Sequence, residues 1–246
     1  MKRTRNFPSL VLVFSLIATV IALPLSAREK EAEDVAIKAM YDRLNAIEAL
    51  LASPATGTVS EENTDTERFD LLAEAGRICH DIQAQTSTAM AEKGFTFFDE
   101  ALSVNDDPAT RAYLGSLHLI EARDAKSILK KIAEVDRGLK EIDRALELLK
   151  AQENQTDSVL SSDSIIVRVV RVECSIGLPD MFNRIDHVSE DLNWLLKKWI
   201  ESPAIFRNTY SPSRLLLLKA QELDLRGNKE FADRYRQKAA ELEGGE

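Results

Sequence analysis

The side chains best suited to acid–base, nucleophilic or metal chemistry are few in this 246-residue sequence. The histidines and cysteines are His80, His118, His187, Cys79 and Cys174, and only Cys79 and His80 are neighbours. Adjacent side chains on a helix point about 100° apart, so this pair does not converge on one metal ion. His118 lies in a helix-prone segment, where we expect its ring to pack between helices.

Motifs of common catalytic and cofactor sites are absent from the sequence: there is no H-E-x-x-H, no G-x-S-x-G, no glycine-rich phosphate loop and no C-x-x-C. Acidic residues mostly stand three or four positions from Lys or Arg, as Lys140, Asp143 and Arg144 do, which is typical of a solvated helix face. We therefore expect no catalytic residue, no metal site and no cofactor, in a protein that is not an enzyme. A ligand or hydrolytic site built from non-adjacent helices stays an alternative, because local motifs would not reveal it.

The N-terminus has the pattern of a cleaved signal peptide. A positively charged start precedes an apolar run over residues 9–23, and cleavage is expected after Ala27. An uncleaved anchor is the alternative, but fifteen residues rise only about 22 Å as a helix, against a hydrocarbon core of roughly 30 Å. We expect a periplasmic or secreted protein with no stable membrane insertion after cleavage.

The charge balance limits the possible partners. With 41 acidic and 32 basic residues the formal net charge is −9, and residues 1–27 contain basic residues but no acidic ones. Nucleic acid and anionic membranes bind basic surfaces, so neither is an expected partner. An oxidising compartment would allow a Cys79–Cys174 disulfide, although a free thiol is equally ordinary inside a helix.

Helical periodicity dominates the chain, and the prolines beyond residue 27 fall between apolar-periodic segments. Residues 164–177 are rich in β-branched side chains, but Ile165, Val169, Val172 and Ile176 share a helical face, so we expect a helix. We predict an all-α chain in which residues 28–246 form one domain. Its expected parts are an amphipathic helix at 28–53, a loop at 54–68, helices within 69–150, a loop at 151–163 and helices within 164–246. The expected helices are 31–51, 69–83, 88–102, one beginning at 108, the segments 124–135 and 137–150, then 164–177, 180–200, 212–225 and 229–242.

Small residues recur at fixed spacing at the ends of three segments. "GFTFFDEAL" from Gly94, "GLKEIDRAL" from Gly138 and "ADRYRQKAA" from Ala232 each place Ala seven positions after a small residue. They resemble the second helix of a tetratricopeptide repeat, and "AYLGSLHL", with Gly115, resembles the first helix. We predict that the missing Cβ of Gly115 lets its partner helix approach closely, which offsets the roughly 1 kcal/mol that glycine costs inside a helix.

The order "AYLGS…AR…GL…ID.AL.L…VR..R…S..LP" over residues 112–179 is similar to a family of exported, tetratricopeptide-like bacterial proteins with no established biochemical activity. The resemblance implies an α-solenoid of antiparallel helix pairs with an extended middle repeat. A solenoid binds on the concave face lined by its first helices. The repeats place these residues there: Ser116, Leu119, Val167, Arg171, Arg214, Gln221 and Asp224.

We therefore expect a non-enzymatic scaffold that binds a protein or peptide partner in the envelope. Arg171 and Arg214 are the most interesting of its candidate residues, because a guanidinium binds a carboxylate or another anion. Ordinary surface ion pairs are the alternative for both. A structural role through self-association, using the N-terminal amphipathic helix, is a further possibility, and homo-oligomers are compatible with it.

Overall fold

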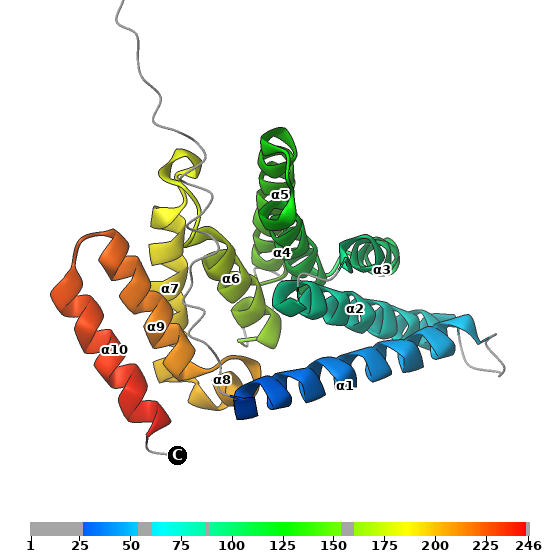
Figure 1. Ribbon diagram of the computed structural model, residues 1–246, viewed down its shortest axis with the longest axis horizontal. Helices are drawn as coiled ribbons and strands as arrows, with labels where there is room; N and C mark the ends of the chain where they lie inside the picture. The colour runs from blue at the N-terminus through cyan, green and yellow to red at the C-terminus, as the bar shows by residue number, and fades with distance from the viewer. Residues whose placement is uncertain (1–26, 54–60, 87–88, 154–159, 245–246) are drawn as a thin grey trace, which may run out of the picture.

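Every regular element in the part of the chain that the structure describes is helical (Figure 1). The structure is a computed structural model that describes residues 27–53, 61–86, 89–153 and 160–244. The all-α prediction is confirmed for these residues. The elements are α1 (Ala27–Ala52), α2 (Glu61–Thr86), α3 (Ala91–Val104), α4 (Pro108–Asp124), α5 (Ile128–Glu153), α6 (Ser162–Ser175), the 3-10 turn η1 (Asp180–Phe182), α7 (Ile185–Glu201), α8 (Pro203–Thr209), α9 (Pro212–Leu225) and α10 (Lys229–Glu243).

Most helix boundaries agree with the sequence prediction, and one loop does not. The predicted loop at 54–68 is wrong in its second part, because α2 already begins at Glu61. Polar residues in this stretch favour turns, but two glutamates in a first turn favour a helix N-terminus. Arg68 is then placed to pair with Glu100 of α3 at 3.3 Å. The predicted signal segment lies outside the described residues except for Ala27.

The second half also differs from the prediction in detail. The β-branched segment is helical, as expected, and forms α6. The helix predicted from residue 180 begins at Ile185 instead, after η1 and Asn183, whose φ is 50°. The short helix α8, which begins at Pro203, is an element that the sequence analysis does not predict.

Consecutive helices with short connections pack side by side, as α2 and α3, α4 and α5, and α9 and α10 do. From right to left in Figure 1 these pairs follow one another, with α6 and α7 between the second and the last. Contacts between α2 and α4, α4 and α6, and α7 and α9 join neighbouring pairs. The predicted extension of the middle hairpin is present, since α5 alone is 26 residues long. It begins at Ile128, four residues after the predicted start of the first segment, and runs without a break through the second.

Gly115 and Gly138 mark the closest approach of α4 and α5. A Cβ on Gly115 would lie 2.6 Å from the carbonyl oxygen of Gly138, and a Cβ on Gly138 would lie 2.6 Å from the carbonyl oxygen of Gly115. Real Cβ atoms do not reach backbone at this distance. The predicted packing role of Gly115 is therefore confirmed, and its partner is the second glycine of the repeat pattern.

Side chains define several helix ends. Asp107 caps α4 by accepting a hydrogen bond from the Thr110 amide at 2.7 Å, with Pro108 in the first turn. α3 has no cap of its own. The buried Gln83 of α2 supplies one, because its Oε1 accepts from the amides of Met90 and Ala91 at 2.7 and 3.1 Å.

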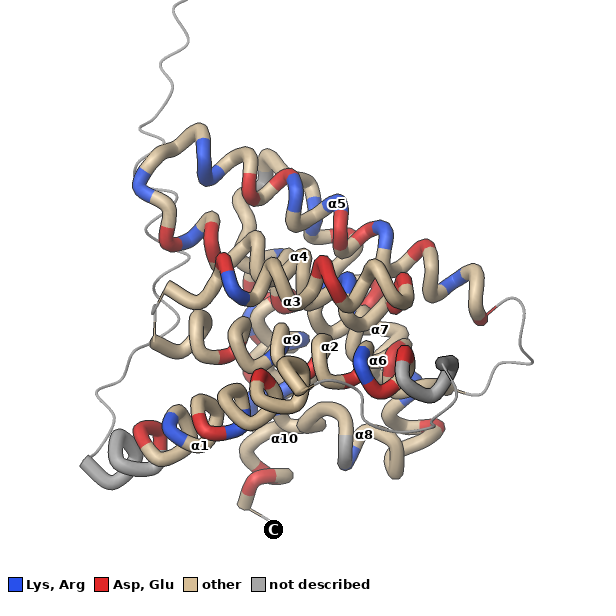
Figure 2. The backbone as a smooth tube through the Cα atoms, turned by 90° about the vertical axis from the view of Figure 1, so that its right-hand side faces the viewer, with Lys and Arg blue, Asp and Glu red and all other residues tan. Residues whose placement is uncertain are grey.

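The apolar interior is a row of clusters shared by neighbouring helices. Ile142, Leu146 and Val167 belong to one such cluster between α4, α5 and α6, and Ile165, Leu192 and Leu215 to the next between α6, α7 and α9. Acidic and basic residues alternate along α1 and α5 (Figure 2). Within the described ranges, no helix is both long and apolar enough to cross a membrane.

Candidate functional site

A chain of polar side chains connects three helices that are distant in sequence. His80 of α2 lies between its neighbour Asp81 and Ser116 of α4, with Nδ1 2.8 Å from Asp81 Oδ1 and Nε2 2.9 Å from Ser116 Oγ. Cys174 of α6 lies beside Ser116, since the Ser116 hydroxyl opposes the rise in the pKa of this thiol. The Tyr113 ring packs edge-on against the imidazole at 5.5 Å and fixes its orientation. We call Asp81, His80, Ser116 and Cys174 the relay.

The hydrogen-bonding capacity of the groups sets the direction of the relay. An ionised carboxylate only accepts, so the Asp81 contact places a proton on Nδ1 of His80. Nε2 of the neutral ring is then an acceptor, and Ser116 must donate to it. Burial raises the pKa of Cys174 to about 12, although the nearby Ser116 hydroxyl opposes the rise, so this thiol stays protonated. The serine hydroxyl is thus polarised toward the imidazole.

A second polar cluster adjoins the relay, because Glu173 precedes Cys174 on α6. Glu173 Oε1 accepts from the Tyr210 hydroxyl at 2.8 Å and from Arg214 Nε at 2.9 Å. Burial and the Glu173 charge both raise the pKa of Tyr210. Arg214, whose side chain is 66% exposed, therefore forms the ion pair that was the alternative to anion binding. Ser116 and Arg214 are joined through two consecutive residues of α6.

The structure corrects the placement of Arg171. Its residue is only 4% exposed, and its Nε lies 3.2 Å from Oδ2 of the buried Asp191 on α7. Arg168 binds the other oxygen of Asp191 at 2.8 Å and stacks on Trp194 at 4.3 Å. Positions 168 and 171 point away from position 173 on the helix, so Glu173, not Arg171, shares the face of Ser116.

The remaining predicted site residues are less closely linked to the relay. Leu119 is half-buried and Val167 is fully buried in the apolar cluster between α4, α5 and α6. Gln221 is half-buried on α9, and Asp224 pairs with Arg236 of α10. Of the positions that the repeat alignment proposes, Ser116 and Arg214 are thus partly or fully exposed, whereas the α6 positions Val167 and Arg171 are buried.

Sequence reasoning missed His80 as a site residue. Its partner Ser116 is 36 positions away, so no local motif connects them. The inference that adjacent Cys79 and His80 diverge is confirmed, since Cys79 packs with Leu44 and Ile47 beneath α1. An alignment of α2 with α4, each taken as the first helix of a repeat, would have been the one sequence signal that places positions 80 and 116 on the same face.

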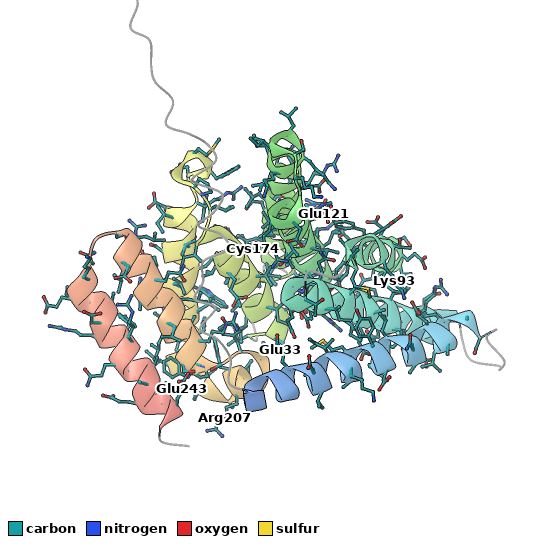
Figure 3. The ribbon with its side chains drawn as sticks, in the orientation of Figure 1. Glu33, Lys93, Glu121, Cys174, Arg207 and Glu243 are labelled. Carbon is teal, nitrogen blue, oxygen red and sulfur yellow. The ribbon has the colours of Figure 1, made fainter. Side chains whose placement is uncertain are left out.

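Both cysteines are free thiols in the structure, in separate apolar clusters, and the bridge between them is not formed. Burial raises the pKa of Cys79 to about 11. Cys174 is labelled in Figure 3, on the part of α6 that packs beside α4. Each thiol is therefore held as a protonated, apolar side chain.

The other histidines stand apart from the relay. His118 packs against Phe95 with ring centres 4.5 Å apart and bonds Glu134 at 2.7 Å, while His187 is exposed. The expected packing of the His118 ring between helices is confirmed. In the described residues, no group of three or more His, Cys, Asp or Glu side chains is arranged to hold a metal ion.

Comparison of the chain with protein-family models, with curated proteins and with solved structures finds no match. The relay and the Glu173 cluster are therefore interpreted from their own geometry.

Proposed function

We propose that the protein is an exported, tetratricopeptide-like scaffold that binds a protein or peptide partner. The helix pairs would form an α-solenoid in which α2, α4, α6 and α9 are first helices. Reciprocal glycine contact between α4 and α5 supports this architecture, because repeat helices approach through small residues. The contacts of α4 with both α2 and α6 support it as well.

The outer face of α10 fits the same proposal. Only Ala232 and Ala239 of this helix are buried, and its remaining surface carries mainly charged side chains, including an Arg234–Glu230 ion pair. Terminal repeats of a solenoid need such a polar outer face.

The observation that carries the binding function is the continuity of polar side chains across first helices. Asp81, Ser116, Glu173 and Arg214 come from α2, α4, α6 and α9. Hydrogen bonds join Asp81 to Ser116 through His80 and Glu173 to Arg214, and Ser116 lies beside Cys174, the residue that follows Glu173. Arg77 lies near this face, since its charge opposes the rise in pKa that burial and Asp81 cause at Tyr113. Cations, carboxylates and aromatic rings together suit a peptide backbone with mixed side chains.

The test is affinity capture from the envelope fraction of the native cells. Alanine at both Arg77 and Arg214 should weaken binding of the captured partner at least about tenfold, which titration calorimetry with the purified partner measures. Arg234→Ala, on the outer face of α10, is the matched control and should leave affinity unchanged. Equal affinity for the double variant and the control would remove this face from the proposal.

The export part of the proposal has its own test. Mass spectrometry of the protein recovered from the envelope should find a mature N-terminus at Arg28. An intact Met1 on the recovered protein would contradict cleavage.

A further inference from the structure

We infer that Ser116 is an activated nucleophile, and that this face of the protein accepts an acyl group from a small carboxylic ester or thioester. The inference goes beyond partner binding and departs from the expectation that the protein has no enzymatic activity. It rests on the order of the contacts: a carboxylate orients an imidazole, and the imidazole accepts from a serine hydroxyl.

The two distances meet the geometric requirement for base-assisted attack. Nucleophile and base must lie within about 2.6–3.2 Å, and Ser116 Oγ lies 2.9 Å from His80 Nε2. Asp81 holds the other nitrogen at 2.8 Å, which selects the tautomer with a free lone pair at Nε2. His80 is therefore placed to take the serine proton.

Access to Ser116 and stabilisation of developing charge are the next requirements of this inference. The residue is partly exposed, as is Asp81. Ser116 lies inside α4, where the backbone amides are committed to the helix, so an oxyanion has to be met by side chains. Tyr113, one turn earlier on α4, is kept protonated because burial and Asp81 raise its pKa, and Arg77 adds a nearby positive charge.

Other serines show that this arrangement is not a general property of the fold. Ser103 donates to the Glu100 carbonyl oxygen at 2.6 Å, and Ser189 donates to the Glu222 carboxylate. Glu222 is also paired with Lys219 and Arg226, and its pKa is lowered, so it is a weak base. In the part of the chain that the structure describes, Ser116 is the serine recorded with an imidazole partner.

The reaction balances without a cofactor. Ser116 Oγ forms a bond to the acyl carbon while its proton moves to His80 Nε2. The bond from that carbon to the leaving oxygen or sulfur then breaks, and His80 returns the proton to the leaving group. Water attacks the acyl-serine by the same route, which releases a carboxylic acid and restores the hydroxyl.

The experiment uses the mature full-length chain and two probes, a fluorophosphonate and p-nitrophenyl acetate. Intact-mass and peptide mass spectrometry should find one phosphonyl adduct, located on Ser116, and release of p-nitrophenol should exceed the rate of buffer alone. Ser116→Ala should abolish both signals. His80→Gln should slow both by about 100-fold or more, the usual contribution of a general base.

Positioning by Asp81 needs a separate readout. Asp81→Asn should slow labelling by at least about tenfold without lowering the melting temperature, because Asp81 is partly exposed, and Asp81→Glu should recover part of the rate. Ser103→Ala is the matched serine control and should label as the wild type does.

Absence of a Ser116 adduct, or equal labelling of wild type and His80→Gln, would overturn the inference. Circular dichroism melts of each variant ensure that a loss of labelling is not a loss of fold. Partner binding is measured in a separate experiment. A protein that binds a partner but has no reactive serine therefore gives a different result from one that has a reactive serine but binds no partner.

Discussion

Helices α2–α5 and helices α6–α10 meet their neighbours through different kinds of side chain. In the first group the tightest contacts are at glycines: Gly76 faces the Phe98 ring, Gly94 faces Leu117, and Gly115 faces Gly138. Each added Cβ would come within 3.0 Å of another atom. This half is held together by close packing, because small residues let the backbones and large side chains of neighbouring helices approach one another.

The second group is built around buried charges. Arg168, Arg171 and Asp191 lie between α6 and α7, and Lys219 and Glu222 lie between α7 and α9. Most of the buried polar atoms that lack a hydrogen-bond partner, among the described residues, also lie here, including Arg168 Nε and Ser175 Oγ. No glycine among the described residues of this half has a comparably close neighbour.

The difference teaches that one all-helical chain can be stabilised in two ways. A glycine contact is specific because any added side chain would disrupt it, and it involves no charged group. A buried ion pair gains little net stability over apolar packing, yet losing one partner leaves a costly unpaired charge. The two halves should therefore respond differently to single and combined substitutions.

The largest expected effect is at the glycine contact. Gly115→Leu places a side chain against the Gly138 carbonyl and Ile142, so α4 and α5 must separate. We expect a loss of about 4 kcal/mol or more in the free energy of unfolding, far above the propensity difference. Chemical denaturation of the mature chain measures it.

Gly177→Ala is the control for this substitution. Gly177 is exposed at the end of α6 and has no atom within 4 Å of its Cβ position, so the expected change is within about 0.5 kcal/mol. Unfolding curves for Gly115→Leu that coincide with those of Gly177→Ala would disprove the packing role.

The next effect is at the buried charges. Asp191→Ala leaves two buried guanidiniums without their carboxylate and should cost about 3–5 kcal/mol. The triple variant with Arg168→Met, Arg171→Met and Asp191→Leu removes every charge and should be more stable than Asp191→Ala. A triple variant that is no more stable would mean that the charges themselves hold α6 and α7 together.

The contrast also explains which features follow from the sequence alone. Helical periodicity and small residues at regular spacing are local signals, so the all-α class can be predicted from the first and the packing role of Gly115 from the second. A contact such as His80 with Ser116 or Arg171 with Asp191 depends on which residues of separate helices meet, and single-sequence periodicity does not contain this. The repeat alignment therefore places Arg171 on the predicted binding face, whereas the residue is buried against Asp191, and periodicity gives no reason to include His80.

The start of α2 and the whole of α8 show a second limit. Residues 61–68 contain Thr, Asn and Asp, which favour turns in isolation. In the protein these residues belong to α2, and Arg68 pairs with Glu100 of α3, a tertiary contact that composition does not show. Pro203 indicates the end of a helix, but it also begins the seven-residue α8.

The smallest expected effect tests whether buried charge makes the second half sensitive to acid. Burial raises the pKa of Glu222, but hydrogen bonds from Ser189 and Lys219 and the charges around it outweigh this and lower the pKa below 4.5. A carboxyl with a lowered folded-state pKa stabilises the protein above its unfolded pKa, and this contribution is lost as pH falls through the lowered value. Glu222→Gln should therefore cost about 1–2 kcal/mol in the free energy of unfolding at pH 7, and this difference from wild type should become smaller in acid.

Denaturation series at neutral and acidic pH measure this stability gap. Glu201→Gln is the exposed control, and its stability at neutral pH should hardly change. A gap that is constant with pH would mean that Glu222 acts through packing, which would make this half resemble the glycine-packed one.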